Sequence, residues 1–543
     1  MNSEHGTSRQ TREDPLRDRE PSPEHRATVS RPVAVIDIGT TSIRMEVAEI
    51  SNDGSVRTLQ QLFQAVNLGK DTFTTGSLQK NTIEKCVRIL KSYRQVLNEF
   101  QITKDDQIRI VATSSVREAE NRLTFLDRIY SATGFQIEPI EEPDVVRITY
   151  LGIQPFLRVE SALSDRRSLI VEVGGGSTEL LLVQGEDVLA SHTYRLGTVR
   201  LWESLNRMQS THMPGREIMA DRINQMVDQI QHQLGKEGVD QMVALGGDMR
   251  FAASHLLEDW TPDELGRLPL QELDRFADLI LHQSFDQIVR KFRLSYDDAA
   301  TLGPALLVNQ TIANRLGLDH LLVTRFSLRD GLLKEMASRE TWNTSFDEQI
   351  LRSAHEVARK FHLDLRHAEQ VELLSRKLFA ALRTEFGIDV RHEVLLRTAA
   401  LLHESGMYLE SSGYHKHSMY IMLHCELFGL SRRGLLLASL VARYHRRASP
   451  KPTHQGYDTL SREERVLVRQ LAAILRVADA LDRSRSARVG DIECEIQERR
   501  FVINVPHATD LSVEQLAIKQ KGSLFEDIFG LQVVLRPSRK SVS

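Results

Sequence analysis

One motif constrains the fold of this chain more than any other, and it occurs twice: a buried strand runs into a short loop of small residues and then into a second strand. The two copies cover residues 33–47 and 169–183. The acids that close the first strand of each copy, Asp37 and Glu172, are 135 residues apart. A second pair of strand-to-loop junctions, at Thr113 and Gly246, is 133 residues apart. Two junctions at nearly the same offset predict a duplicated α/β unit whose halves face each other across a cleft.

The rest of the chain divides by its local pattern. The first 31 residues mix Arg, acidic residues, Pro and Ser with almost nothing large and apolar, which predicts a disordered tail. After Trp342 the strand signals stop and helical periodicity takes over, and after Gly490 short strands return. We therefore expect two α/β halves, an all-α domain and a small α+β domain. The expected boundaries are residues 1–31 for the tail, then 32–160, 161–340, 345–487 and 488–543.

Composition excludes several classes of protein. The 543 residues carry a formal net charge of −4 and only 6% of them are aromatic, which argues against specific nucleic-acid binding. The three cysteines are far apart and form no CxxC motif, so we expect neither a disulfide framework nor a cysteine zinc site. The longest apolar run has nine residues, far short of the ~20 that span a bilayer. With no apolar signal core at its N-terminus, the protein is expected in the cytoplasm, with no membrane partner.

The two loops have the composition of phosphate-binding loops. Small residues allow successive backbone N–H groups to point at an anion. The residues expected to bind phosphate are Gly39, Thr40, Thr41, Ser42, Gly174, Gly175, Gly176, Ser177 and Thr178. Three carboxylates adjoin these loops, those of Asp37, Glu172 and Glu179. Because a carboxylate repels phosphate, carboxylates beside a phosphate site usually hold Mg²⁺ or handle a water molecule.

Six segments occur in the order known from one protein family. They are DIGTTSIR at residues 37–44, ATSSVREAEN at 112–121, EVGGGSTE at 172–179, GTVRL at 197–201, LGGD at 245–248 and LRDGL at 328–332. On these segments the chain resembles the exopolyphosphatase/guanosine-pentaphosphate phosphatase (Ppx/GppA) family of the sugar-kinase, Hsp70 and actin (ASKHA) fold group. The resemblance implies a duplicated actin-like, ribonuclease-H-like α/β module, then an all-α HD-like domain and a small α+β cap.

The same resemblance implies an activity. Members of the family remove the terminal phosphate of inorganic polyphosphate, or the 5′ phosphate of pppGpp, using an activated water and Mg²⁺ or another divalent metal ion. Carried over by position, Asp37, Glu172 and Glu179 would hold the metal. Arg117 would clamp the phosphate, and Glu179 would also position the water. We expect an exopolyphosphatase. The alternatives are a pppGpp 5′-phosphatase and a catalytically impaired regulator that binds polyphosphate or (p)ppGpp.

Two positions depart from the family pattern. The acid before the second loop is Asp in the family and Glu172 here, one methylene longer. In the family, the second Glu of a Glu-Glu-Ala-Arg-Leu segment is the catalytic base, and alignment on the following Arg and Gly places Val145 there. A valine cannot accept a proton. We therefore expect low activity, with Asp144, one position earlier, as a replacement catalytic acid–base residue and two preceding glutamates as further candidates.

The helical region carries histidines and acids in the order seen in HD-type metal phosphohydrolases. They are His367, His403, Glu404, His445 and Asp479, with Glu404 in place of the usual Asp. Imidazole and carboxylate groups drawn from several helices suit a divalent metal ion, and His367, His403, Glu404 and Asp479 are the candidate ligands. The alternative is that these are ordinary core histidines of a domain that needs no metal. The sequence leaves both interpretations open.

A basic cluster lies in the same region. It consists of Arg443, His445, Arg446 and Arg447. A run of charges is usually a solvated surface, but the family's substrate is a long polyanion. We therefore expect this polyanion patch to bind the polymer through contacts that weaken as salt rises. The expected partners are inorganic polyphosphate or (p)ppGpp, and the oligomeric state is left open, with a homodimer among the candidates.

Overall fold

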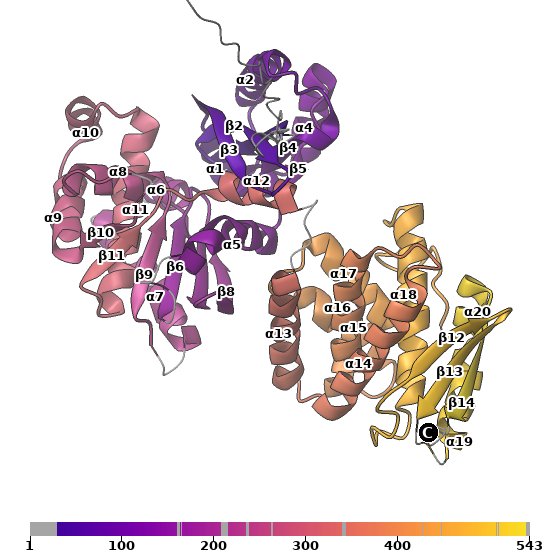
Figure 1. Cartoon of the computed structure of the whole chain (residues 1–543). Coiled ribbons are helices and arrows are strands. Elements are labelled where there is room, and N and C mark those ends of the chain that lie inside the picture. Colours follow the sequence, from indigo (N-terminus) through magenta and orange to yellow (C-terminus); the bar gives the residue numbers. More distant parts are fainter. Residues whose placement is uncertain are drawn as a thin grey trace, which may run out of the picture.

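The computed structural model describes residues 30–159, 163, 166–207, 215–234, 238–261, 264–338, 344–425, 427–446, 448–506, 508 and 510–538. An α/β module with two sheets is followed by a group of helices and then by a small sheet (Figure 1). Residues 1–29 of the predicted disordered tail lie outside the described residues. Ser30 and Arg31 already belong to the first strand, so the predicted tail ends two residues too late.

The first half of the module is a five-stranded sheet with the order β3-β2-β1-β4-β5. Its elements are β1 (Ser30–Ile38), β2 (Ser42–Ser51), β3 (Val56–Ala65), α1 (Leu68–Thr75), α2 (Lys80–Glu99), the 3₁₀ turn η1 (Asp105–Gln107), β4 (Ile108–Ala112), α3 (Ser114–Arg117), α4 (Arg122–Thr133) and β5 (Glu138–Pro139). Helix α2 buries Ile83, Val87, Leu90 and Leu97, which recur at helical spacing. This face joins α4 and one side of the sheet in a single apolar core.

The second half is a six-stranded sheet with the order β10-β11-β9-β6-β7-β8. Its elements are α5 (Glu142–Val159), β6 (Arg167–Val173), β7 (Thr178–Gln184), β8 (Asp187–Tyr194), α6 (Thr198–Arg207), α7 (Gly215–Leu234), β9 (Gln241–Leu245), α8 (Gly247–Leu256), β10 (Gly266–Pro269), α9 (Leu270–Leu281), α10 (Phe285–Phe292), α11 (Tyr296–Arg315), β11 (His320–Val323) and α12 (Leu328–Ser338). The central strands β6 and β9 are almost wholly buried because helices cover the sheet.

The two sheets repeat one topology. In the first, β1, β2 and β3 pair antiparallel in sequence and β4 joins β1 in parallel. In the second, β6, β7 and β8 pair in the same way and β9 joins β6 in parallel. The strand register sets Asp37 opposite Arg44, and Glu172 opposite Glu179. The predicted duplicated actin-like α/β module is confirmed.

Helices α5 and α12 tie the two halves together. Although α12 is the last element of the module, its Leu332 packs in one core with Val33 and Val35 of β1. Helix α5 lies against α12 and the second sheet. The helices cross closely, because a Cβ atom on Gly331 would lie 1.9 Å from the carbonyl oxygen of Ile148 in α5. Only glycine therefore fits at this position of the LRDGL segment.

The helical unit consists of α13 to α18. Its elements are α13 (Thr344–Lys360), α14 (Leu365–Leu382), the 3₁₀ turn η2 (Val390–His392), α15 (Glu393–Leu402), the 3₁₀ turn η3 (Ser405–Tyr408), α16 (Tyr414–His424), α17 (Arg432–Arg443) and α18 (Arg462–Leu481). Helix α18 begins at a capping box, in which the N–H of Glu464 donates to the Ser461 hydroxyl and the N–H of Ser461 donates to the Glu464 carboxylate. No helix among the described residues is long and apolar enough to cross a membrane.

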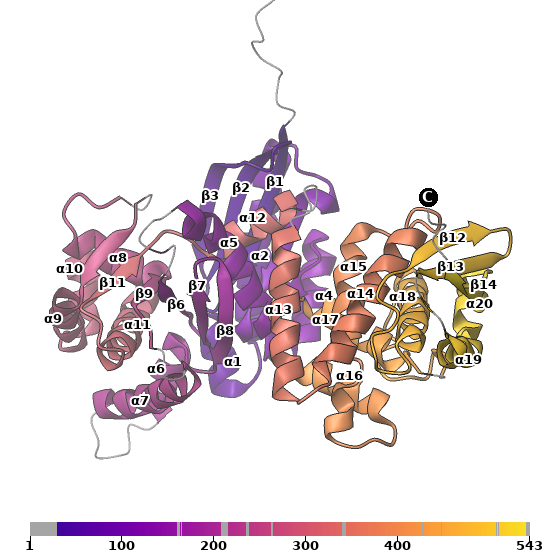
Figure 2. The same cartoon turned by 60° about the horizontal axis from the view of Figure 1, so that its bottom comes forward.

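The C-terminal unit is a three-stranded sheet with two short helices. It comprises β12 (Glu493–Gln497), β13 (Arg500–Pro506), α19 (Ser512–Lys521), α20 (Ser523–Phe529) and β14 (Gln532–Ser538). Phe501 and Phe525 belong to the same apolar core as the helical unit. In both cartoon views the orange helices lie between the α/β module and the yellow C-terminal sheet (Figures 1 and 2).

An aromatic contact joins the module to the helical unit. The ring of Tyr150, in α5, lies 5.4 Å from that of Phe428 and 6.2 Å from that of Phe346, between ring centroids. The Tyr150 hydroxyl also donates to the carbonyl oxygen of Glu186 at 2.6 Å. Helix α5 therefore contacts both halves of the module and the helical unit, which places it at the centre of the molecule.

Candidate active site

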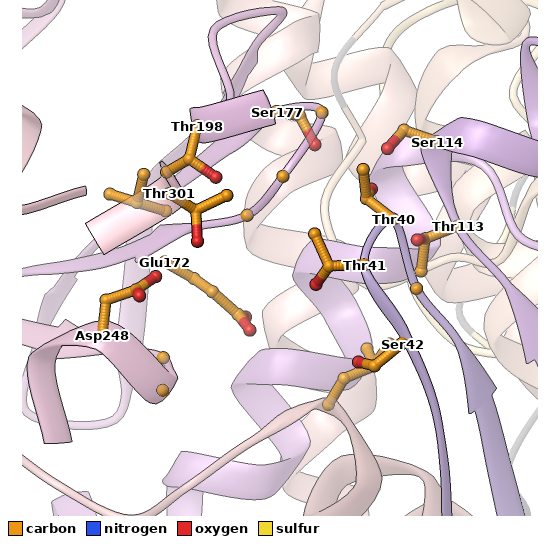
Figure 3. Close-up of a pocket in the computed structure, with 18 of the residues that line it drawn as sticks. Thr40, Thr41, Ser42, Thr113, Ser114, Glu172, Ser177, Thr198, Asp248 and Thr301 are labelled. Atoms are coloured by element: carbon orange, nitrogen blue, oxygen red, sulfur yellow. The ribbon is translucent and has the colours of Figure 1, made fainter. Parts of the chain in front are cut away.

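The two predicted phosphate loops share one backbone geometry. The N–H of Gly39 donates to the carbonyl oxygen of Ser42, and the N–H of Gly174 donates to that of Ser177, each at 2.9 Å. Both loops line one cavity of about 370 Å³ between the two halves of the module, which we call the cleft. Figure 3 shows Thr41 on one side of this space and Ser177 on the other, with Glu172 pointing into it.

The loops touch across the cleft. A Cβ atom on Gly175 would lie 2.6 Å from Cβ of Thr40, closer than two such carbon atoms can approach. Thr40 in turn faces Ser115, whose hydroxyl lies 3.4 Å from the Thr40 hydroxyl. The structure thus brings eight of the nine predicted phosphate-binding residues to the cleft, and glycine at position 175 is what lets the two loops close on each other. The prediction is wrong for Thr178, which is buried in β7 and donates its hydroxyl to the carbonyl oxygen of Leu196.

Carboxylates crowd the same cavity. Burial raises the pKa of Asp37 and of Glu172, although Glu172 accepts a hydrogen bond from the Thr149 hydroxyl at 3.1 Å. Burial and the neighbouring charge of Glu172 raise the pKa of Glu179 to about 8. Glu179 also accepts a hydrogen bond from the Ser177 hydroxyl. The cleft therefore holds more negative charge than its own side chains neutralise.

This donor set fits a hard divalent cation. The Oδ1 atom of Asp37 is buried and has no hydrogen-bond partner, and its Oδ2 atom is 3.7 Å from the Arg329 guanidinium. All the donors are carboxylate oxygens, which Mg²⁺ prefers to nitrogen and sulfur. Mg²⁺ usually takes one or two protein carboxylates and completes its shell with water and substrate phosphate. Asp37, Glu172 and Glu179 supply such oxygens, but no choice of one oxygen from each places all three within 4.8 Å of one another, so a cation here would take one or two of these carboxylates.

Arginines flank the loops. Arg117 is buried at the edge of the cleft, where it donates to the carbonyl oxygen of Ile140 at 2.9 Å and to the Glu142 carboxylate at 3.2 Å. Arg200 donates to the carbonyl oxygen of Gly176 at 2.9 Å and to both carboxylate oxygens of Glu118. Arg200 thus holds the second loop in place, whereas the other donor positions of Arg117 can face a ligand.

The structure places Val145 and Asp144 on different sides of α5. Val145 lines the cleft. Asp144 lines another groove, where its carboxylate lies 3.5 Å from the Arg147 guanidinium and 3.5 Å from the backbone nitrogen of Arg432. The prediction that Asp144 replaces the missing base is therefore wrong for this conformation, because the helix turns its side chain away from the phosphate loops.

Several cleft residues are absent from the predicted site. They include Arg44, Thr198, Asp248, Phe251, Asp298 and Thr301. Burial and the charge of Asp298 raise the pKa of Asp248 to about 6. A sequence signal for Asp248 existed, since it follows the β9 strand at the position that matches the loop after β4. Asp298 and Thr301 lie on α11, where nothing local distinguishes them from a solvated helix face.

A second cavity of about 640 Å³ lies between the module and the helical unit, and we call it the interdomain groove. Arg117 lines both this groove and the cleft, so the two spaces adjoin. Arg122, Arg195 and Arg432 bring further positive charge to it. Three acidic residues also line the groove. Glu118 is paired with Arg195 at 3.1 Å and with Arg200, Glu142 is paired with Arg117 at 3.2 Å, and the third is Glu141.

The polyanion patch is only partly on the surface. Arg446 is exposed and lies over the ring of Tyr414, with 4.9 Å from its guanidinium carbon to the ring centroid. His445 is fully buried, and its Nδ1 faces the carbonyl oxygen of Ala442. The prediction that His445 contributes to a surface patch is therefore wrong. Arg447 lies outside the described residues.

Three of the four predicted metal ligands in the helical unit come together. His367, His403 and Asp479 are buried side by side. Glu404 does not join them, because both of its carboxylate oxygens accept hydrogen bonds from Arg485, at 2.6 and 2.8 Å. The predicted ligand set is therefore wrong in Glu404, whose charge the Arg485 guanidinium already neutralises.

Comparison with known proteins agrees with this arrangement. Residues 47–340 match the sequence model of the Ppx/GppA phosphatase family, and residues 351–519 match that of Ppx/GppA phosphatase, domain III. A guanosine-5'-triphosphate,3'-diphosphate pyrophosphatase of Vibrio cholerae is 26% identical over 488 residues, which cover 88% of this chain and 92% of that protein. The protein of the same name from Vibrio campbellii is 25% identical, over 81% of this chain and 86% of its own length.

A solved structure shares the fold. The exopolyphosphatase from Cytophaga hutchinsonii superposes on 57% of this chain and 98% of its own, with a TM-score of 0.51 and 20% sequence identity.

Proposed function

Because this chain belongs to the Ppx/GppA phosphatase family, we propose that it is a hydrolase that releases the terminal phosphate of inorganic polyphosphate. One observation favours polyphosphate as the substrate. The cleft that holds the phosphate loops and the interdomain groove share Arg117 as a lining residue, and Arg122, Arg195 and Arg432 also line the groove. A linear polyanion could place its last phosphate between the loops while the rest of the chain follows the arginines.

In this proposal the loops bind and orient the reacting phosphate. Their backbone N–H groups and hydroxyls surround its oxygen atoms. Arg117 adds charge-assisted hydrogen bonds, which strengthen as negative charge gathers on the transferred phosphoryl group. Mg²⁺ held by one or two of the carboxylates Asp37, Glu172 and Glu179 would neutralise part of the phosphate charge.

The proton of the attacking water needs an acceptor. Val145 offers none, and Asp144 faces away from the cleft. Glu179 lines the cleft, near the start of β7 and beside the second phosphate loop. We assign Glu179 the role of proton acceptor, and we expect turnover to be slow because the same carboxylate also serves the metal.

The second candidate function is removal of the 5′ phosphate from pppGpp. It is favoured by the relatives named guanosine-5'-triphosphate,3'-diphosphate pyrophosphatase, which align with more than four fifths of this chain. Two aromatic rings, Phe63 and Phe251, also line the cleft and offer surfaces on which a base could stack. A third outcome, binding of either ligand without hydrolysis, would make the protein a regulator.

The test measures phosphate release from long-chain polyphosphate and from pppGpp, with and without Mg²⁺. We expect release from polyphosphate that requires Mg²⁺ and that falls by at least ~100-fold in Glu179→Gln, which keeps the shape of the side chain but not its charge. Phosphate release from pppGpp but not from polyphosphate would support the second candidate function instead. No release from either substrate, together with tight binding of one of them, would reject hydrolysis.

A further inference from the structure

The helical unit contains a group of side chains of the types that can bind a metal ion, and they come from helices that do not line the cleft. His367 comes from α14, His403 from the end of α15 and Asp479 from α18. One nitrogen or oxygen atom from each lies within 4.8 Å of the other two. Their exposed fractions are 4%, 1% and 4%. Among the residues that the structure describes, no other set of three His, Cys, Asp or Glu side chains converges in this way.

Two of these candidate ligand atoms have no hydrogen-bond partner. The Nε2 atoms of His367 and His403 are both buried, and neither has a hydrogen-bond partner. The Nε2 atom of His367 points toward Oδ1 of Asp479, at 3.7 Å, which is too long for a hydrogen bond. Buried polar atoms are nearly always satisfied, so two unsatisfied nitrogens that face one carboxylate call for an explanation.

The remaining polar atom of each side chain is held. Nδ1 of His367 lies 2.8 Å from the Asp482 carboxylate, and Nδ1 of His403 lies 2.7 Å from the carbonyl oxygen of Ala400. The other oxygen of Asp479, Oδ2, accepts a hydrogen bond from Lys521 of the C-terminal unit. A carbonyl oxygen can only accept, so the Nδ1 atom of His403 carries its proton and the lone pair is on Nε2 when the ring is neutral. Such outer contacts fix the orientation of metal-binding histidines and carboxylates.

We propose that His367 Nε2, His403 Nε2 and Asp479 Oδ1 form a site for one divalent transition-metal ion of the zinc, cobalt and manganese group. Two imidazoles and one carboxylate favour these ions over Mg²⁺ and Ca²⁺, which prefer oxygen ligands. Three protein ligands also leave a coordination position for water. The site differs in chemistry from the all-oxygen donor set of the cleft, and it does not depend on the proposed function of the cleft.

The competing explanation for this cluster is that Lys521, and not a metal ion, neutralises Asp479. Its ammonium group pairs with Asp479 through Oδ2, whereas the proposed metal ligand is Oδ1. If the ammonium group were the only cation this cluster needs, no metal would bind. Because Lys521 is the last residue of α19, a metal ion bound to Asp479 would act on the contact between the helical and C-terminal units.

The experiment titrates the EDTA-treated full-length chain with CoCl2. We expect one equivalent of Co²⁺ with visible d–d absorption, displaced by ZnCl2, and X-ray absorption spectra with imidazole scattering. His403→Ala and Asp479→Asn should weaken binding by about 100-fold. The control is His355→Ala, which removes another histidine whose Nδ1 contacts a helix carbonyl oxygen and whose Nε2 lies 3.5 Å from a carboxylate.

Two results would overturn the proposal. One is wild-type protein that binds no Co²⁺, or binds it without imidazole scattering, as an all-oxygen site in the cleft would. The other is Co²⁺ binding that persists unchanged in folded His403→Ala. The spectra of the wild-type chain decide the matter even if both substituted proteins fail to fold.

Discussion

Residue 145 is the point at which this chain departs furthest from the expected chemistry of its family. Val145 occupies a wall of the cleft, close to the loops and Arg117. Successive residues on an α-helix are about 100° apart around its axis, so Asp144 cannot face the cleft while Val145 does. The structure thus removes the nearest substitute for a base, and in the function that we propose Glu179 takes the water's proton instead.

Restoring a carboxylate at this position should raise activity. We expect Val145→Glu to increase phosphate release from polyphosphate by at least ~10-fold, because general-base catalysis is typically worth 10²–10⁴ in rate. Initial rates at saturating substrate and Mg²⁺ measure the effect. Val145→Gln is the matched control, since it has the same length and no proton-accepting charge. An equal gain in both proteins would show that side-chain size, not basicity, limits the wild type.

The buried carboxylate of Asp248 should make the free energy of unfolding depend on pH, which allows a test of the charge in the cleft. Its carboxyl group has a pKa of about 6 in the folded protein and about 3.8 in the unfolded chain, so the folded state holds its proton more tightly. The folded protein therefore loses stability as pH rises from about 4 to 6. Asp248→Asn lacks this loss, and we expect it to be more stable than wild type by about 1–2 kcal/mol at pH 7.5 and by less than half of that amount at pH 4.5.

Melting temperatures of Mg²⁺-free protein at the two pH values measure this difference. The exposed Asp221→Asn, on α7, should match wild type at both. A stabilisation by Asp248→Asn that is the same at pH 4.5 and pH 7.5 would contradict a buried charge as its cause.

At the scale of elements, the crossing of α5 and α12 sets the geometry of the cleft. Helix α5 carries Val145, and α12 packs against β1, whose end carries Asp37. Their backbones approach at Gly331, where an added Cβ would meet the carbonyl oxygen of Ile148. Because backbone atoms cannot rotate out of the way, any side chain at position 331 must push the helices apart.

Gly331→Ala should therefore destabilise the module and impair the cleft. We expect a loss of about 1–3 kcal/mol, typical of overpacking, seen as a lower melting temperature. The rate of phosphate release should fall as well, since Val145 and the loops shift together. Gly490→Ala is the control, because an added Cβ there meets nothing within 4 Å. Wild-type stability and activity in Gly331→Ala would mean that the crossing is looser than the structure shows.

At the scale of the whole molecule, the helical unit completes a surface that the module lacks on its own. The interdomain groove takes Arg117, Arg122 and Arg195 from the module and Arg432 from α17. The contact of Tyr150 with Phe346 and Phe428 holds the two parts together beside this groove. A polymer bound along it would touch both parts at once.

Removing positive charge from the groove should affect long substrates selectively. We expect the double substitution Arg122→Ala and Arg432→Ala to raise KM for long-chain polyphosphate by about 10-fold and to flatten its dependence on salt, because fewer counterions are released. Short chains should be hydrolysed almost as before. Arg275→Ala, an exposed arginine on α9, controls for net charge. Equal effects on long and short chains would place both arginines at the reacting phosphate.

Much of this architecture could be predicted because it depends on local pattern and spacing. Apolar runs that end in small-residue loops define strands and phosphate loops, and their near-constant offset of 135 and 133 residues indicates the duplication that the two sheets confirm. Local pattern does not locate every break between elements, and one such break is at Gly522, where α19 ends and α20 begins. Such breaks depend on the residues that pack around the turn.

The sequence by itself therefore determined the duplicated fold, the family and the two loops of the cleft, because each follows from residue type and order. Only the tertiary structure decided which side chains meet. The rotation of α5 directs Val145 into the cleft and Asp144 away from it. Arg485 donates hydrogen bonds to the Glu404 carboxylate, which therefore does not join the histidines of the helical unit. The first outcome depends on how a packed helix is rotated about its axis, and the second on which oppositely charged side chain pairs with Glu404 in the folded protein. Neither property is encoded in the spacing of residues along the chain.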